Sequence, residues 1–248
     1  MKKLIAALIL SMGLSTSVYA DVDIKAELEN AMVYRKSENY QKAFEIYSKL
    51  ASQNIAKAQA ELGWLYEYGH GVKQDYTQAV YWYQKAAEQN HAVAQYNLGV
   101  SYNNGNGLNK DHHQAVYWFK KSAIQGLSYA QYELGIAYRD GVGVKQDYHQ
   151  AVDWFKKAAE QGHANAQLEL GRRYSEGQGV RQNHQQALSW YKKAVNQGNA
   201  MAYHNIAHMY YYGVGVKKSL VIAKENFGKA CDAGLQQGCN AYRELNNR

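Results

Sequence analysis

Three small sets of residues have types and spacings that could support chemistry. Ser189 and Lys192 form a Ser-x-x-Lys pattern, which in serine β-lactam hydrolases supplies the nucleophile and a lysine beside it. Those enzymes also carry Ser-Asp-Asn and Lys-Thr-Gly motifs, and neither occurs in this chain. The sequence therefore predicts no catalytic residue and a protein that is not an enzyme.

Two histidines form the second set. His204 and His208 stand four residues apart on a predicted helix, a spacing that can hold zinc. The glutamate of a His-Glu-x-x-His site is replaced by Asn205, and no sulfur or carboxylate ligand lies nearby in the sequence. We therefore interpret the pair as polar side chains on a binding face and expect no metal and no cofactor. The third set, Cys231 and Cys239, depends on the repeats described next.

A repeat of 36 residues positions all three sets. A Leu-Gly pair, a Gly-x-Gly pair, an alanine and a tryptophan recur in phase. The recurring residues are Leu62-Gly63, Leu98-Gly99, Leu134-Gly135 and Leu170-Gly171; Gly69/Gly71, Gly105/Gly107, Gly141/Gly143, Gly177/Gly179 and Gly213/Gly215; Ala79, Ala115, Ala151, Ala187 and Ala223; Trp82, Trp118, Trp154 and Trp190. A fixed period of this length is typical of stacked supersecondary units. The Gly-x-Gly pairs lack the third glycine and the preceding strand of a dinucleotide site.

The apolar spacing within each repeat predicts two helices. The Gly-x-Gly pair is expected to end the first helix in the left-handed conformation. Asp147 then opens a second helix as N-cap, and Gln150 completes a capping box. The mid-helix glycine predicts a close approach of the second helix, with Ala79 and its equivalents opposite. In this frame Ser189 takes the place of Tyr81, so we interpret the Ser-x-x-Lys pattern as a coincidence of the repeat.

The composition agrees with a helical repeat. The chain of 248 residues is 46% apolar and 20% charged, with no proline, 23 tyrosines and 4 phenylalanines. Proline breaks helix interiors, so its absence favours helices joined by short glycine turns. These values exclude a disordered chain, a collagen-like chain and a disulfide-dense miniprotein.

The N-terminus predicts a secretory signal peptide. Lys2 and Lys3 precede an apolar run from Leu4 to Leu10, and Val18-Tyr19-Ala20 has small residues before a cleavage site. The run is shorter than the roughly 20 residues that span a bilayer. We therefore expect cleavage after Ala20 and a periplasmic or secreted chain without a membrane span.

The cysteine pair falls between two predicted helices. Cys231 and Cys239 stand where other repeats have Ala87 and Gln95, with a turn between them. In an exported chain a single pair of cysteines favours a disulfide, and its short loop limits the stabilisation to about 2–3 kcal/mol. The alternative is two buried thiols.

The repeated motifs closely resemble the Sel1-like repeat, a relative of the tetratricopeptide repeat. The matching motifs are Ala-x-Ala-Gln-x-x-Leu-Gly-x-x-Tyr, Gly-x-Gly-Val-x-x-Asp and Ala-x-x-Trp-Tyr/Phe-x-Lys-Ala-Ala. The resemblance implies an all-α fold, a right-handed α-solenoid of stacked antiparallel helix pairs in which neighbouring copies provide the core. The expected organisation is a signal peptide (1–20), a tetratricopeptide-like helix pair (21–54), Sel1-like repeats (55–90, 91–126, 127–162 and 163–198), a degenerate repeat (199–234) and a capping helix (235–248).

The cysteine spacing also resembles that of secreted cysteine-rich Sel1-repeat proteins. In that group every repeat carries such a pair, whereas here only the last one does. Some of its members are described as penicillin-binding or β-lactamase proteins. This resemblance implies an alternative function, a hydrolase acting on β-lactams or peptidoglycan.

The family resemblance also implies where a partner binds. Tetratricopeptide-type solenoids bind extended peptides or partner surfaces in a concave groove lined by the first helix of each pair. The residues at these positions differ from repeat to repeat, as a binding face would, and include aromatic and arginine anchors. They are Trp64, Glu67, Tyr68, Tyr96, Asn103, Tyr129, Tyr132, Arg139, Arg172, Glu176, His204, His208, Tyr211 and Tyr212. The alternative is that these side chains pack between helices.

We therefore interpret the chain as an exported scaffold that binds a protein or peptide partner in the bacterial envelope. A further alternative is an immunity or inhibitor protein for an exported partner. Lysines such as Lys85 and Lys121 recur near the end of the second helix, where they complement the helix dipole. The alternative for this stripe is an anionic polymer or acidic protein, and nucleic acid is not expected.

Overall fold

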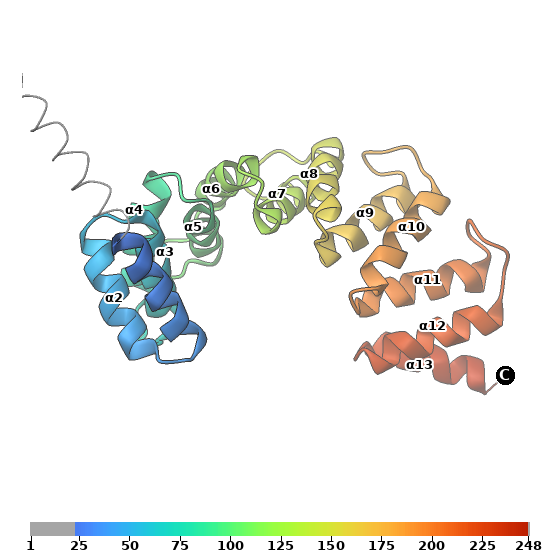
Figure 1. The fold of residues 1–248 in the computed structure, drawn as a ribbon. Helices are drawn as coiled ribbons and strands as arrows, with labels where there is room; N and C mark the ends of the chain where they lie inside the picture. Colours follow the sequence, from blue (N-terminus) through green and yellow to red (C-terminus); the bar gives the residue numbers. More distant parts are fainter. Residues whose placement is uncertain (1–22, 248) are drawn as a thin grey trace, which may run out of the picture. The chain divides into compact units, whose positions relative to one another are not determined.

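The computed structural model describes residues 23–247, so the signal peptide predicted for residues 1–20 lies outside the described range. Within that range all regular secondary structure is helical (Figure 1). The chain divides after Asp111 into two compact units, which we describe separately.

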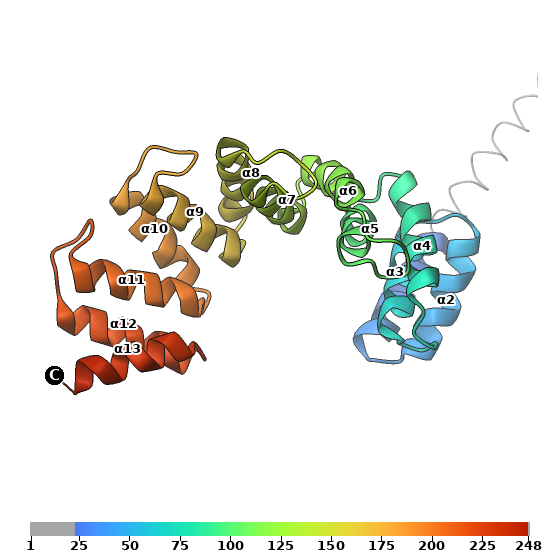
Figure 2. The same ribbon diagram turned by 180° about the vertical axis from the view of Figure 1, so that it is seen from behind.

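Both units are stacks of helices in which each helix, from α2 onward, packs against the next one of the same unit. Unit 1 contains a helix over residues 23–36 followed by α2 (Tyr40–Ser52), α3 (Ala56–Tyr68), α4 (Tyr76–Glu88) and α5 (Ala92–Asn104). Unit 2 contains α6 (His112–Ile124), α7 (Ser128–Asp140), α8 (Tyr148–Glu160), α9 (Ala164–Glu176), α10 (His184–Val195), α11 (Ala200–Tyr212), α12 (Leu220–Asp232) and α13 (Gln236–Asn246). The last three helices lie side by side in both ribbon views (Figures 1 and 2).

Small and apolar side chains fill the space between these helices. In unit 2, for example, Leu168 on α9, Leu188 and Tyr191 on α10, and Ile206 on α11 belong to one buried cluster. A single hairpin could not bury such a cluster alone, because the contacts come from neighbouring pairs. The predicted all-α fold of stacked helix pairs is confirmed within each unit.

The helix ends follow the repeated glycine and cap positions. Gly141 ends α7 and Gly177 ends α9, both in the left-handed conformation, as predicted. The Asp147 side chain accepts hydrogen bonds from the backbone N–H groups of His149 and Gln150 and so opens α8. These two features give each repeat the same sharp turn between its helices.

In the expected capping box, the glutamine side chain accepts a hydrogen bond from the backbone N–H of the N-cap residue. In the structure a backbone carbonyl accepts this hydrogen bond instead. The backbone N–H of Asp147 donates to the carbonyl of Tyr138 on the preceding helix, at 2.8 Å. Because this donor is already satisfied, the helix needs no glutamine side chain to reach back to it. Ser219 accordingly caps α12 although Ile222 stands at the glutamine position, and its own N–H donates to Tyr210 at 2.9 Å.

The mid-helix glycines receive an aromatic ring from the second helix of the pair. A Cβ atom on Gly63 would stand 2.7 Å from the Tyr83 ring, and one on Gly171 would stand 2.5 Å from the Tyr191 ring. The predicted close approach is therefore present. The expectation of a small opposing surface was incomplete, because the rings lie on the glycines and Ala79 contributes its carbonyl oxygen beside Gly63.

At the start of α3, α5, α7 and α9, a buried glutamine links the helix pair to the helix before it. Gln131 on α7 donates to the carbonyl of Ala123 at the end of α6, at 3.2 Å. The side-chain oxygen of Gln131 accepts a hydrogen bond from Gln161, at 2.8 Å. The same arrangement recurs at Gln167, with Ala159 and Gln197 as its partners. These bonds satisfy both ends of a buried amide, which would otherwise be costly to bury.

The disulfide replaces this glutamine bond at the end of the chain. Cys231 and Cys239 are joined, with their Cα atoms 4.5 Å apart and a separation of eight residues. The bond from Gln95 to Ala87 spans the same eight residues in its own repeat. The predicted disulfide is thus present, and it fastens α13 to α12 at the position that the buried glutamine occupies in the earlier repeats.

Candidate functional site

One hollow in unit 2 lies along α9 and α11. It has a volume of about 310 Å³ and is lined by Arg172, Ser175, Glu176, Tyr191, Asn205, His208, Met209, Tyr212 and Val214. Four of these residues, Arg172, Glu176, His208 and Tyr212, were predicted from the sequence to bind a partner. The structure therefore brings together predicted residues from α9 and α11, the first helices of two successive repeats, in one hollow.

A second, smaller hollow adjoins the first. Its volume is about 110 Å³, and it is lined by His208, Tyr211, Tyr212, Phe227, Ala241, Glu244 and Leu245. His208 and Tyr212 line both hollows and stack on one another, with ring centroids 5.8 Å apart. We call the surface formed by these two hollows the two-cavity face. It offers a polar slot next to a mainly apolar one, a combination suited to orienting a bound side chain.

His204 lies beside His208 on α11. Their Nε2 atoms are 2.9 Å apart, and each ring meets the edge of Phe227 from α12. Burial lowers the pKa of His204 to about 4, helped by the neighbouring His208, and burial also lowers the pKa of His208. The imidazole of His204 is therefore neutral at pH 7, and burial favours the neutral form of His208 as well.

A network of ion pairs surrounds Arg172, one of the residues that line the two-cavity face. Glu169, whose side chain is only 7% exposed, contacts Arg139 on α7 at 3.0 Å and Arg172 at 3.2 Å. Arg173, 8% exposed, lies 3.9 Å from Glu169 and 3.2 Å from Glu176. Arg139 also pairs with Asp140, which holds the pKa of the Asp140 carboxyl below its usual value. This network fixes the predicted residues Arg139, Arg172 and Glu176 relative to one another.

Sequence reasoning missed Glu169 and Arg173, although a signal was present. The two residues are four apart on one helix, the spacing of a stabilising Glu–Arg pair. The corresponding residues of the next repeat are Asn205 and Met209, which cannot form such a pair. Asn205, Ser175, Tyr191 and Glu244 were also not predicted, because nothing in the repeat distinguishes a cavity wall from a packed surface.

Two predicted tyrosines of α7 pack against a histidine instead of lining a hollow. Tyr132 stacks on His163 with ring centroids 4.6 Å apart, and Tyr129 meets the same ring at 5.2 Å. His163 in turn accepts a hydrogen bond from the backbone N–H of Ala166 and caps α9. The alternative interpretation, in which the side chain packs between helices, therefore applies to Tyr132. Tyr129 is exposed.

In unit 1 the predicted residues fall into three groups. Trp64 and Tyr68 form an aromatic cluster with Tyr40 and His70, in which Tyr68 is exposed and the other three rings are half-buried. The Arg35 guanidinium lies 5.0 Å from the Trp64 ring. Glu67 accepts a hydrogen bond from the Tyr83 hydroxyl at 2.5 Å, so it joins the two helices of its pair. Tyr96 and Asn103 lie half-buried on α5.

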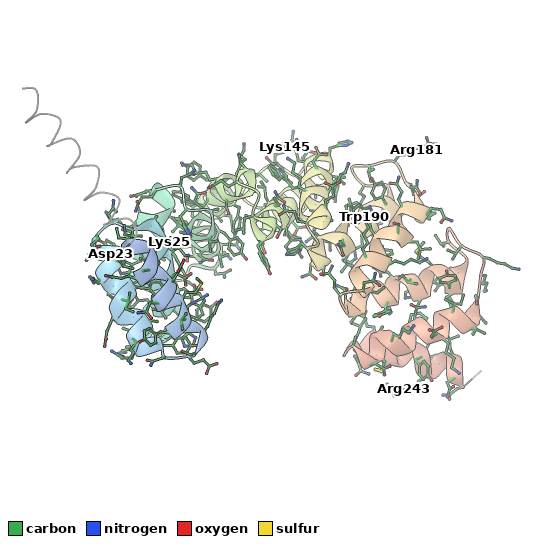
Figure 3. All side chains as sticks on the ribbon, viewed as in Figure 1. Asp23, Lys25, Lys145, Arg181, Trp190 and Arg243 are labelled. Atoms are coloured by element: carbon green, nitrogen blue, oxygen red, sulfur yellow. A yellow bond between two sulfur atoms is a disulfide. The ribbon has the colours of Figure 1, made fainter. Side chains whose placement is uncertain are left out.

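The Ser-x-x-Lys pattern lies on the exposed surface of one helix. Ser189 and Lys192 are both exposed on α10, the helix that also carries the labelled Trp190 (Figure 3). Over residues 23–247, no three or more histidine, cysteine, aspartate or glutamate side chains gather as metal ligands. No helix in the same range is long and apolar enough to cross a membrane.

The fold and the two-cavity face define a helical-repeat scaffold of a class that typically mediates protein interactions. A model of the Sel1 repeat matches residues 33–55, 56–91, 92–127, 128–163, 164–199 and 200–235. The chain therefore belongs to the Sel1-repeat family, whose members are generally not enzymes.

Solved structures agree with this assignment. The chain is 30% identical to a protective antigen of uropathogenic Escherichia coli with an SLR fold, at a TM-score of 0.83, over 90% of this chain and 48% of that one. It thus spans about half the length of that antigen. A Sel1 repeat protein from Oxalobacter formigenes is 29% identical over 87% of this chain and 86% of its own, with a TM-score of 0.82. No curated protein matches the sequence.

An immunity protein from Pseudomonas aeruginosa shares the fold at lower similarity. It is 23% identical over 90% of this chain and 82% of its own, with a TM-score of 0.53. This level of identity establishes a common fold and nothing about a common partner.

Proposed function

We propose that this Sel1-repeat chain is an exported scaffold that binds a protein or peptide partner in the bacterial envelope through the two-cavity face. The observation that carries the proposal is the convergence of Arg172, Glu176, His208 and Tyr212 on adjoining hollows. Export rests on the signal peptide predicted for residues 1–20. Sel1 repeats mediate protein interactions, which supports a partner of this kind.

The chemistry of the face favours an extended segment with mixed side chains. Tyr212 is 65% exposed and separates the polar hollow from the apolar one, so a partner can contact it on both sides. Tyrosine and arginine are enriched among the residues that dominate binding energy in protein interfaces. Arg172 is held in place by Glu169, so little conformational entropy is lost when it binds.

A pull-down from envelope extracts with Tyr212→Ala tests this proposal. Removing a central interface tyrosine typically weakens binding by about 2 kcal/mol, or roughly 30-fold, so we expect the specific partner to be lost. The matched control is Tyr117→Ala on α6, because Tyr117 is also exposed, at 48%, but lies outside the two-cavity face. The partner should stay bound to the control. Equal binding to both variants would show that recognition occurs elsewhere.

The alternative hydrolase makes a separate prediction. Ser189 is exposed on α10, and nothing around it supplies the partner motifs of a serine β-lactam hydrolase. We expect neither the wild-type chain nor Ser189→Ala to turn over nitrocefin. Turnover by the wild type that Ser189→Ala abolishes would establish the hydrolase and defeat the scaffold as the main function.

A further inference from the structure

The His204–His208 pair has a geometry that neither the fold nor partner binding requires. Two side chains from successive turns of α11 direct the same ring nitrogen, Nε2, to one point. We propose that this pair is a bidentate site for a divalent late transition metal, with Cu(II) or Ni(II) preferred over Zn(II). The inference is independent of the proposed partner, because it concerns the binding of the metal ion alone.

The protonation state of the pair suits a metal. Neutral imidazole is the form that binds metals, because the coordinating nitrogen must offer its lone pair. Both rings are partly buried against Phe227 and present their Nε2 atoms to one another. Without a metal, one Nε2 must donate a proton to the other across their 2.9 Å contact. A bound cation would replace that single hydrogen bond by two coordinate bonds.

The separation of the nitrogens points to particular metals. Imidazole nitrogens lie about 2.0–2.1 Å from a bound metal, so nitrogens 2.9 Å apart subtend an angle of about 90° at the ion. Neighbouring positions of a tetragonal or octahedral ion have this angle, and Cu(II) and Ni(II) prefer such geometries. A tetrahedral zinc would need the two nitrogens about 3.3 Å apart.

The surroundings leave room for the remaining ligands. His208 lines both hollows, whose walls carry Glu176 in one case and Glu244 in the other. No third protein ligand stands within the described residues, so the other positions fall to water or to an incoming group. The nearby cation, Arg172, is paired with Glu169 at 3.2 Å.

One feature of His204 limits the affinity. Its Nδ1 atom is buried without a hydrogen-bond partner. When Nε2 of His204 coordinates a metal, the single proton of the neutral ring must lie on Nδ1. That N–H group then has no hydrogen-bond acceptor. A buried unpaired donor weakens binding by about tenfold or more, so we expect a modest affinity that titration can measure.

Titration calorimetry with CuCl₂, NiCl₂ and ZnCl₂ tests the site on the full chain purified without a histidine tag. We expect one site that binds Cu(II) and Ni(II) more tightly than Zn(II). His204→Gln and His208→Gln should each weaken Cu(II) binding at least tenfold, since a single imidazole cannot chelate. His149→Gln is the matched control, because His149 is exposed on α8 and has no second histidine one turn away.

Electron paramagnetic resonance of the Cu(II) complex gives a second measurement. The spectrum of the wild type should show two coordinated imidazole nitrogens, and that of His208→Gln should show one. Equal Cu(II) affinity in wild type, His204→Gln and His208→Gln would overturn the site. Tighter binding of Zn(II) than of Cu(II) would overturn the tetragonal geometry on which the choice of metal rests.

Discussion

Gly179→Ala is expected to destabilise unit 2 by about 3 kcal/mol. Gly179 has φ +69, a left-handed conformation that costs alanine about 1 kcal/mol. A Cβ atom there would also overlap the carbonyl of Tyr148 at the start of α8, which is backbone and cannot rotate away. Because the loop of one repeat rests directly on the helix of the previous one, relieving the overlap must separate the two repeats, and overpacking of this kind adds about 1–3 kcal/mol.

Denaturant unfolding followed by far-ultraviolet circular dichroism measures this loss. The matched control is Gly162→Ala, because Gly162 also has a positive φ, at +88, but has no atom within 4 Å of the added methyl group. We expect the free energy of unfolding of Gly162→Ala to fall by only about 1 kcal/mol, the cost of holding an alanine in the left-handed conformation. Equal losses in the two variants would show that the contact between repeats contributes little, and that glycine is needed there for its backbone conformation alone.

Glu169→Ala is expected to cost about 3 kcal/mol and to loosen the two-cavity face. The carboxylate is almost fully buried and contacts Arg139, Arg172 and Arg173. Removing one member of a buried ion pair typically costs about 3–5 kcal/mol, because the remaining charge is left in a poor solvent. Glu176 stays 3.2 Å from Arg173, so we expect the lower end of this range.

The measurement is again the free energy of unfolding, and Glu160→Ala is its control. Glu160 is exposed at the end of α8, so its loss should change stability by less than about 0.5 kcal/mol. The double variant Glu169→Asn with Arg173→Met copies Asn205 and Met209 from the next repeat. It should recover part of the stability, since it removes the buried charge of Arg173, while Arg139 keeps Asp140 and the Arg172 side chain is 36% exposed. Failure of the double variant to recover would argue that packing, rather than charge, explains the single loss.

The predicted binding residues have two different roles. Arg172, Glu176, His208, Tyr211 and Tyr212 line the hollows of unit 2. Glu67 and Tyr132 are instead engaged by Tyr83 and His163. All of them stand at comparable positions of the first helix of the 36-residue repeat. The repeat pattern alone therefore could not distinguish residues that line a hollow from residues that pack against another side chain.

The sequence by itself determined the repeat frame, the caps, the left-handed glycines and the cysteine pair. The first three are local requirements that recur at a fixed step, so a single chain shows each of them several times. The cysteine pair occurs once and follows from its place between two expected helices. Tertiary structure alone decided that a tyrosine carbonyl replaces the capping-box glutamine and that Glu169 joins α7 to α9. It alone decided that the histidine nitrogens converge. These contacts depend on how neighbouring helices direct their side chains, and the spacing of residues along one helix does not specify that direction.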